Sequence, residues 1–258
     1  MCGRYASAAR SDDLAEMTGA RDLTGGLPAS PNVAPTTEVA VLVDEPAAVG
    51  RTRVLRAMRW GLVPSWATAV GAGALMINAR VESVAGKPAF REPLKRRRCL
   101  LPAAGWYEWA GGLPAASEGG RARRQPFLTG PASGSPLLLA GLWTTWRPAG
   151  GGDRVDSVAI ITRPAPPDLA WLHDRAPLLV TGTNVDAWLD PAGIDPAPLL
   201  QQLLTAGDPP LATHPVDPAV GDVRRQEPEL VRPVRLAAPV SRPASAARVD
   251  EALQAPLF

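Results

Sequence analysis

The sequence predicts an α+β fold, a single domain with a mixed, barrel-like β-sheet core flanked by a few helices. Short apolar runs separated by loops recur along the chain, as in proteins built from many short strands. Helical patterns are few, and strands and helices do not alternate as they do in a doubly wound sheet. The chain has 258 residues, of which 46% are hydrophobic, enough to bury the core of one large domain.

Seven segments account for the predicted sheet. The first emerges from a proline-rich loop, and the second has a proline near its end. The third, LMINARVES, places a polar asparagine within an apolar run. The predicted strands are 30–43, 53–66, 75–83, 96–110, 136–146, 157–165 and 176–182.

Four short segments have helical character. In the first, Ser11 is a suitable N-cap, acidic residues occupy the first turn, and Gly19 ends the pattern. The predicted helices are 11–20, 168–174, 184–190 and 196–207.

The remaining segments are expected to be loops or a tail. Segments 111–126 and 147–156 are rich in Gly and Arg and are expected to join neighbouring strands. The domain is expected to span residues 1–235. Residues 236–258 are rich in Ala and Pro, and this composition predicts a disordered C-terminal tail.

Composition excludes several classes of protein. No apolar run approaches the ~18 residues of a membrane span, and the N-terminus lacks the pattern of a signal peptide. We therefore expect a cytoplasmic protein, associated with the nucleoid if DNA is its partner. Two cysteines, Cys2 and Cys99, are too few for a disulfide framework, and neither His173 nor His214 pairs with them at a zinc-ligand spacing. We expect neither a metal nor a cofactor.

Net charge does not identify a partner. The formal charge is only +2, yet all 27 basic residues except Lys87 and Lys95 are arginines. A GC-rich genome would explain this, because Ala, Gly and Pro are also abundant. Phosphate recognition by guanidinium groups would explain it too, so each arginine has to be judged by its position.

Cys2 directly follows the initiator methionine in MCGRYAS. Loss of Met1 would give it a free amine and a thiol on adjacent carbons. An α-amine has a pKa near ~7.7–8.0, so roughly a tenth of it is neutral at pH 7. A neutral amine attacks an aldehyde to form a Schiff base, and the thiol can then close a five-membered thiazolidine. The alternatives are an acyl-transfer nucleophile and an ordinary small residue.

Three polar residues lie among apolar neighbours. A buried amide at Asn78 would need partners and could position a nucleophile. Glu108, between two tryptophans in GWYEWA, should have a raised pKa that suits general acid/base work. His173, in WLHDRAP, titrates near neutrality and could protonate a sugar oxygen. Each also fits a purely structural role, which we expect for His214.

Other residues suit contacts with nucleic acid. Trp66 follows a proline turn, so we expect an exposed aromatic that can stack on a base. Arg80 follows Asn78 by two residues and Arg4 follows Cys2 in the same way, and such pairs share one face of a strand. Their guanidinium groups would suit a phosphodiester backbone. The run KRRR at 95–98 is expected to be a solvated charge run.

Together these stretches resemble the SRAP family (SOS-response-associated peptidase fold), the abasic-site processing proteins. The resemblance covers residues 2 to 235 and rests on motifs that occur in one order. No single motif would be specific. They are MCGRY, NVAPTT, MRWGLVPSW, INARVES, RRRCLLPAAGWYEW, IIT with HDRAP, and HPVDPAVGDV.

The resemblance implies the chemistry. It implies a thiazolidine crosslink between the N-terminal cysteine and the ring-opened aldehyde of an abasic site in single-stranded DNA, which shields the lesion. By motif, Cys2 is the nucleophile, Asn78 positions it, Glu108 moves protons, and His173 assists ring opening and crosslink reversal. The implied DNA contacts are Arg4, Arg80 and Arg175 on the backbone, and Pro35, Trp66 and Thr162 along its path.

The sequence departs from the family pattern at two places. HDRAP stands where an HDRMP-type segment is usual, which leaves His173 and Arg175 in place. Asp217 and Asp222 put acid where neutral polar residues are usual. We expect these carboxylates either to lower DNA affinity locally or to change a surface loop.

The last five residues, QAPLF, form a further motif. QxxLF at a C-terminus resembles the peptide by which bacterial DNA-repair proteins bind the replicative sliding clamp. A disordered segment with two apolar anchors suits such docking. The expected contacts are Gln254, Leu257 and Phe258.

Two other functions remain open at the level of sequence. An N-terminal-nucleophile amidohydrolase or peptidase would also use Cys2, but the sequence contains no glutamine-binding segment of the Arg-Gly-Pro-Asp or Asn-Gly-Glu type. Peptidase activity could amount to removal of Met1. A non-catalytic single-stranded DNA-binding module would explain Trp66 and the arginines. It would give Cys2, Asn78, Glu108 and His173 no shared role.

Overall fold

The computed structural model describes residues 2–110, 124–190 and 195–236. Most of the loop expected at 111–126 and of the tail expected at 236–258 lies outside the described residues. The loop expected at 147–156 is present up to residue 154, where the next strand follows. Among the described residues, no helix is long and apolar enough to cross a membrane.

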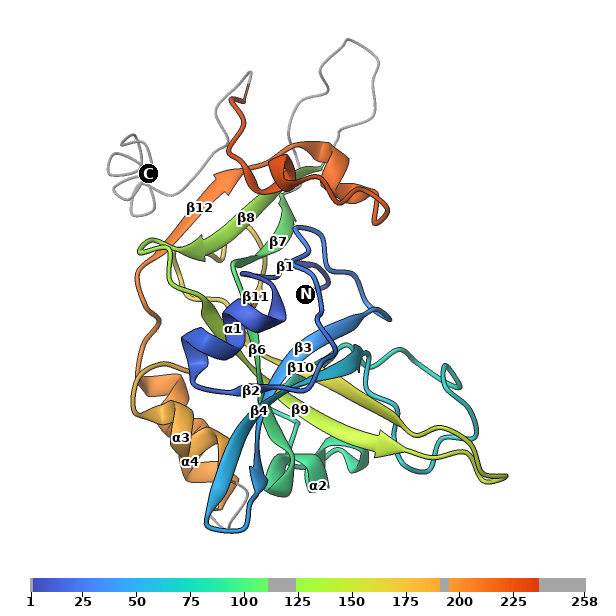
Figure 1. Ribbon diagram of the computed structural model, residues 1–258. Coiled ribbons are helices and arrows are strands. Elements are labelled where there is room, and N and C mark those ends of the chain that lie inside the picture. Colours follow the sequence, from blue (N-terminus) through green and yellow to red (C-terminus); the bar gives the residue numbers. More distant parts are fainter. Residues whose placement is uncertain (1, 111–123, 191–194, 237–258) are drawn as a thin grey trace.

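The larger of two sheets forms the centre of the molecule (Figure 1). Its order is β11-β10-β9-β6-β3-β4-β2, and β5 pairs with β10. The sheet bends back on itself, and β10 also pairs with β4 through Ser157 and Val158. The sheet is therefore ring-like, although it is not a closed barrel. The predicted α+β fold with a barrel-like sheet is confirmed. The strands are β2 (Arg21–Asp22), β3 (Glu38–Pro46), β4 (Arg51–Trp60), β5 (Asn78–Arg80), β6 (Arg98–Ala103), β9 (Leu137–Trp146), β10 (Val155–Pro164) and β11 (Arg175–Pro177).

The smaller sheet is antiparallel and has the order β1-β7-β8-β12. Only Ala104 separates β6 from β7, so one continuous segment joins the two sheets. A Cβ atom at Gly105 would lie 2.5 Å from the carbonyl oxygen of Thr129, so the close approach of β7 and β8 requires glycine there. The strands are β1 (Tyr5–Ala6), β7 (Gly105–Ala110), β8 (Gln125–Pro131) and β12 (Leu211–Pro215).

Three helices lie where the sequence predicted them. They are α1 (Ser11–Thr18), α3 (Asn184–Leu189) and α4 (Pro196–Thr205). Gly19 ends α1 at φ +64°, and its N–H donates to the carbonyls of Ala15 and Glu16. The Asp195 carboxylate accepts from the N–H of Ala197 and caps α4.

The helix predicted at 168–174 is wrong. Those residues form turns, in which the N–H of Leu172 donates to the carbonyl of Leu169 three residues earlier. The segment lies between three prolines at 164–167 and β11, which begins at Arg175, so the chain must become extended directly after these turns and does not continue them as a regular helix. Helix α2 (Pro88–Arg96) was not predicted, because Pro93 and a dense run of charges obscure its apolar face.

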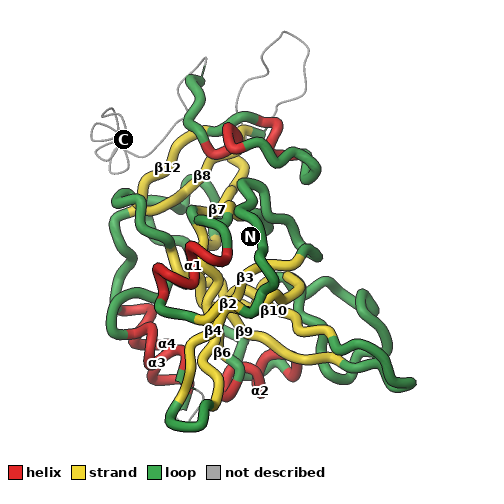
Figure 2. The backbone as a smooth tube through the Cα atoms, viewed as in Figure 1, coloured by secondary structure: helices red, strands yellow, loops and turns green. Residues whose placement is uncertain are grey.

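The core occupies both faces of the larger sheet. One apolar cluster includes Leu14 of α1, Leu94 of α2 and Trp188 of α3. A second cluster joins the two sheets and includes Cys2 and Trp60. Figure 2 shows the N-terminus within the outline of the molecule, and Cys2 belongs to this second cluster. The start of the described chain is therefore built into the core.

Candidate active site

The pairing of β5 with β10 sets the frame of the site. β5 runs parallel to β10, with Asn78 opposite Ile160 and Arg80 opposite Thr162. Asn78 and Arg80 are two residues apart on one strand, so their side chains leave the same face. The short strand thus holds the asparagine and one arginine in fixed positions beside the centre of the larger sheet.

The N-terminal segment is bound to this frame through Asn78. The Asn78 Nδ2 donates to the carbonyl oxygen of Cys2 at 2.9 Å. The Asn78 Oδ1 is buried and has no hydrogen-bond partner among the residues that the structure describes. A buried acceptor without a partner is costly in a folded protein. It is therefore a candidate contact for a donor that arrives with the processed N-terminus or the substrate.

Cys2 is completely buried. Burial raises the pKa of its thiol well above the usual range, and the nearby charge of Glu108 raises it further. The thiol is therefore protonated at neutral pH. In the chain with Met1, the nitrogen of Cys2 is an amide and cannot attack a carbonyl. In the form with Met1, neither the thiol nor the nitrogen of Cys2 is therefore a ready nucleophile.

Glu108 lies on β7, next to the N-terminal segment. The N–H of Tyr107 donates to the carbonyl of Arg4 at 2.9 Å, which ties β7 to the residues that follow Cys2. Glu108 is 5% exposed, and this burial raises its pKa to about 7. A carboxyl group that titrates near neutrality can both donate and accept a proton at physiological pH.

His173 closes the other side of the site. Its Nδ1 accepts from the N–H of Arg175 at 2.9 Å and also lies 2.7 Å from Oδ1 of Asp174. The two contacts require different protonation states of Nδ1. We assign the first, because burial lowers the pKa of His173 and the Asp174 side chain is 85% exposed. The neutral ring then carries its proton on Nε2.

The structure brings the four candidate catalytic residues into one region. Glu108 and His173 line the same small hollow, together with Trp106 and Arg175. The carbonyl of Cys2 accepts a hydrogen bond from Asn78, and the charge of Glu108 is close enough to raise the pKa of the Cys2 thiol. A larger cavity of about 430 Å³ lies beside Pro35 and contains none of the four. The chemistry of these residues, rather than the volume of the hollow, identifies the site.

The predicted DNA contacts occupy different environments. Arg80 is exposed and has no ion pair in the described part of the chain. Arg175 is bound by Glu82 through two hydrogen bonds of 2.5 and 3.1 Å and donates to the carbonyl of Thr162 at 2.7 Å. The Thr162 side chain is itself fully buried. Of these residues, only Arg80 presents an unpaired cation to solvent.

Arg4 is engaged within the protein. Its Nη1 donates to Oδ1 of Asn32 at 2.6 Å and to the carbonyl of Val220 at 2.8 Å. The guanidinium also lies 5.9 Å from the ring centroid of Trp109. These contacts fix Arg4 as a tie between the N-terminal segment and residues 218–226.

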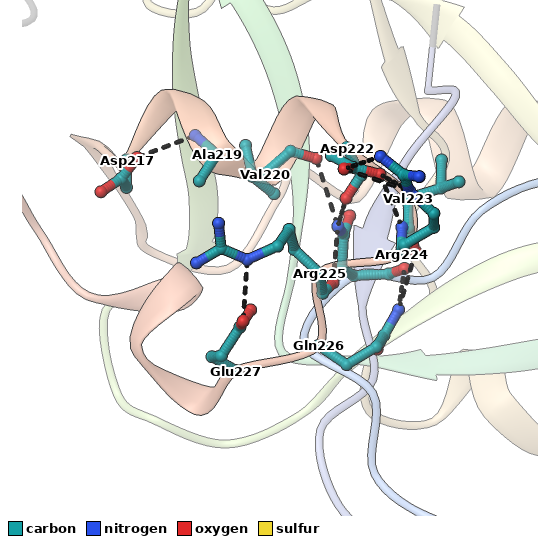
Figure 3. Close-up of polar contacts among 10 residues, drawn as sticks. Asp217, Ala219, Val220, Asp222, Val223, Arg224, Arg225, Gln226 and Glu227 are labelled. Atoms are coloured by element: carbon teal, nitrogen blue, oxygen red, sulfur yellow. Dashed lines mark hydrogen bonds and ion pairs between the residues drawn. The ribbon is translucent and has the colours of Figure 1, made fainter.

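Asp217 and Asp222 have local partners in this segment (Figure 3). Asp217 accepts from the N–H of Ala219 at 2.8 Å and caps the 3-10 helix η1 (Pro218–Gly221). Asp222 binds the guanidinium of Arg224, at 2.7 Å from its Nη2. Of the two expectations for these acids, the arrangement favours a changed surface loop, because the charge of Asp222 is compensated.

The chain matches the family described as SOS response associated peptidase (SRAP) over residues 1–223. The chain belongs to this family. It is 32% identical over 234 residues to the abasic site processing protein YoqW of Bacillus subtilis, covering 90% of this chain and 99% of YoqW. It is 32% identical over 246 residues to the abasic site processing protein YedK of Escherichia coli, covering 91% of this chain and all of YedK.

Solved structures agree with the SRAP assignment at the level of the fold. A protein from Bacteroides thetaiotaomicron superposes with a TM-score of 0.74 at 19% identity, covering 91% of this chain and all of that one. A phage-related protein from Bordetella bronchiseptica gives a TM-score of 0.60 at 29% identity, covering 83% of this chain and 94% of that one.

The sequence did not identify two residues that contact the site residues, Glu82 and Asn32. Glu82 lies two residues after Arg80, and this spacing alone was a weak sign that it belongs to the site. Asn32 is the first residue of the motif NVAPTT, and its side chain donates to three carbonyls of a segment about 190 residues away, those of Val220, Asp222 and Arg225. Nothing in its local sequence marks that role.

His214 makes a structural contact outside the site. Its Nε2 lies 2.9 Å from the carbonyl oxygen of Val231.

Proposed function

We propose that this protein processes abasic sites in single-stranded DNA by forming a thiazolidine crosslink through Cys2 after removal of Met1. The contact between Asn78 and the carbonyl of Cys2 carries this proposal, because it fixes the residue that must become the N-terminus. The names of the relatives YoqW and YedK support the substrate. Such a substrate would place the protein at the nucleoid.

The proposed chemistry balances without a cofactor. The neutral amine of Cys2 attacks the C1′ aldehyde of the ring-opened sugar and forms a carbinolamine. Loss of water gives the Schiff base, and the thiol then adds to the imine carbon, with its proton passing to the nitrogen. One C–N bond and one C–S bond form, and one water leaves. Because the thiol is buried and protonated, we expect its addition to be the last step, once the imine carbon lies beside it.

Glu108 can supply the proton transfers, and His173 can supply a hydrogen bond. A carboxyl with a pKa of about 7 can take a proton from the attacking amine and return it to the leaving hydroxyl. His173, neutral with its proton on Nε2, can donate a hydrogen bond to the ring oxygen of the closed sugar and stabilise the charge that develops there as the aldehyde is released. The buried Oδ1 of Asn78 can accept a hydrogen bond from the new amine.

The test is adduct formation on DNA that carries one abasic site. We expect the wild type to give a heat-stable band on a denaturing gel and Cys2→Ala to give none. Cys2→Ser should give an adduct only after borohydride reduction, because its hydroxyl cannot form the thiazolidine. Cys99→Ala is the matched control, since Cys99 is equally buried but outside the site. A wild-type protein without Met1 that forms no adduct would rule out the proposal.

The other functions fit the site less well. A non-catalytic binding module would gain nothing from burying the Glu108 carboxyl, which costs free energy when ionised. An amidohydrolase would need a glutamine-binding segment, and the sequence contains none of the Arg-Gly-Pro-Asp or Asn-Gly-Glu type. Release of ammonia from glutamine would favour the amidohydrolase.

We also propose that the C-terminal segment binds the replicative sliding clamp. The expected contacts, Gln254, Leu257 and Phe258, lie outside the described residues, so the motif alone supports this proposal. A peptide of residues 249–258 should bind purified clamp, and Phe258→Ala should abolish binding. No binding by the wild-type peptide would refute it.

A further inference from the structure

Two buried hydroxyl groups lie beside the candidate active site and have no part in the chemistry described above. Thr129 of β8 and Thr213 of β12 are directly opposite each other in the smaller sheet, and their Oγ1 atoms are 2.9 Å apart. Thr129 is fully buried, and Thr213 is 5% exposed. Two hydroxyls are thus withdrawn from water at one point of the sheet.

The register of the smaller sheet places this pair on the same face as Glu108. Thr129 is opposite Trp106 of β7, and Glu108 is opposite Phe127 of β8. Residues that are directly paired across two strands, or two apart on one strand, project from the same face of a sheet. Both hydroxyls therefore lie on the face that carries the candidate acid/base.

Thr129 lines the small hollow that Glu108 and His173 also line. The volume of this hollow is about 10 Å³, which is the room of about one water molecule. Of the predicted DNA contacts, only Arg175 lines it, and Trp66 is 60% exposed on the loop after β4. A space of this size, with a carboxyl, an imidazole and a hydroxyl in its walls, suits one small polar molecule.

The hydroxyl of Thr129 can contact such a molecule whichever way the pair is oriented. A threonine hydroxyl carries one hydrogen and two lone pairs. If Thr213 donates to Thr129, the hydrogen of Thr129 is available to the hollow. If Thr129 donates to Thr213, a lone pair of Thr129 is available instead. Thr213 does not line the hollow, so its contribution is to orient Thr129.

We propose that the Thr129 hydroxyl, oriented by Thr213, binds the oxygen that leaves C1′ as water when the carbinolamine becomes the Schiff base. This role rests on the proposed function and adds a residue to its chemistry. Glu108 gives a proton to the carbinolamine hydroxyl, the C–O bond breaks as the C=N bond forms, and the proton of the nitrogen returns to the carboxylate. One water is released and held beside Thr129. In crosslink reversal the steps run backwards, and this water attacks the imine carbon.

The test compares the rates of adduct formation and adduct release on single-stranded DNA that carries one abasic site. Release is followed as loss of labelled DNA from purified adduct in excess unlabelled strand. The same oxygen takes part in both directions, so losing its hydrogen bond should slow both rates by the same factor. We expect Thr129→Val, which keeps the shape of the side chain, to slow both about tenfold, the effect of about one hydrogen bond. Thr213→Val should slow both by about threefold, because it removes only the orienting partner.

Further variants separate the hydroxyl from packing and from DNA binding. Thr129→Ser retains the hydroxyl and should keep both rates close to those of wild type. Thr144→Val is the matched control, because Thr144 is buried on β9 outside the hollow, and it should leave both rates unchanged. Thr129→Val should bind the same DNA without the abasic site with an unchanged Kd, since the hydroxyl acts only at the reacting carbon. Thermal melting checks that each variant is folded, and Thr213→Val provides the same test if Thr129→Val does not fold.

Three results would overturn the role of Thr129. They are wild-type rates in Thr129→Val, an equal slowing in Thr129→Ser, and slower formation with unchanged release. Each of these leaves the proposed function intact, because the wild type still forms the adduct. A wild type that forms no adduct would refute the proposed function and the role of Thr129 with it.

Discussion

Glu108 couples the stability of the protein to pH. Its folded-state pKa of about 7 lies above the ~4.3 of an unfolded chain. A carboxyl whose pKa is raised on folding contributes stability below the unfolded pKa and loses it as the pH rises through the folded pKa. The native state therefore loses stability between about pH 4 and pH 8, as burial in the site makes the ionised form costly.

Replacing the carboxyl should remove this loss. We expect Glu108→Gln to raise the free energy of unfolding relative to wild type at pH 8 by about 1–3 kcal/mol, with little change at pH 4. Urea unfolding at both pH values measures the difference. An equal effect at both pH values would show that packing, not ionisation, is responsible. The same variant should form the adduct more slowly, which would separate the two roles of the residue.

Thr36 stores backbone strain next to Pro35. Its φ is +78°, a region that β-branched residues rarely adopt, and its N–H donates to the carbonyl of Trp60 at 2.7 Å. Thr36→Gly should therefore stabilise the protein by about 0.5–1 kcal/mol. Thr37→Gly is the matched control and should destabilise it, because Thr37 lacks the strained φ and its hydroxyl bonds the carbonyl of Ala34. Thermal melting of both variants checks the opposite signs.

At the scale of elements, two neighbouring arginines have different roles. Arg96 ends α2, and Arg98 begins β6. Arg98→Met should lower the free energy of unfolding by about 3 kcal/mol or more, because it leaves buried carbonyls without donors. Arg96→Met should change it by less than about 0.5 kcal/mol, because that side chain is exposed. Urea unfolding compares the two. Similar losses would contradict the distinct roles assigned to them.

The sequence predicted those elements whose pattern is local. β3, β4, β9 and β10 carry apolar runs long enough to identify, and α1 and α4 have clear end signals. β8 and β12 were missed because Pro, Gly and Thr interrupt their apolar character, and pairing between them supplies what local pattern lacks. The predicted helix at 168–174 failed because adjacent prolines and the start of β11 override its apolar spacing.

The candidate site was predictable to the extent that its motifs were. Cys2, Asn78, Glu108 and His173 could be named from short stretches, and the fold places them in one region. What the sequence could not give is which arginines are already paired. Arg175 is held by Glu82 and Arg4 by Asn32, and both contacts depend on distant segments meeting in the fold. Charge in a sequence therefore overstates the number of cations available to DNA.

At the scale of the whole molecule, residues 218–236 hold the N-terminal region in place. Asn32 donates to the carbonyls of Val220, Asp222 and Arg225, and Arg4 shares the first of these. Leu236 packs against the cluster around Phe127, so the contacts of the described chain continue to its last residue. The proposed SRAP domain should therefore need these residues for its stability. The Ala- and Pro-rich composition of the residues that follow predicts that it needs none of them.

Two truncations test this boundary. A chain ending at Leu236 should melt within about 3 °C of the full chain, a difference of no more than ~1 kcal/mol for a protein of this size. It should also form the adduct at the same rate. A chain ending at residue 216 removes every acceptor of the Asn32 amide, which is 1% exposed, and should lose about 3 kcal/mol or more together with adduct formation. If the shorter chain were as stable as the longer one, the hydrogen bonds of Asn32 and Arg4 to residues 220–225 would not hold the N-terminal region. The position of Cys2 would then depend on Asn78 alone.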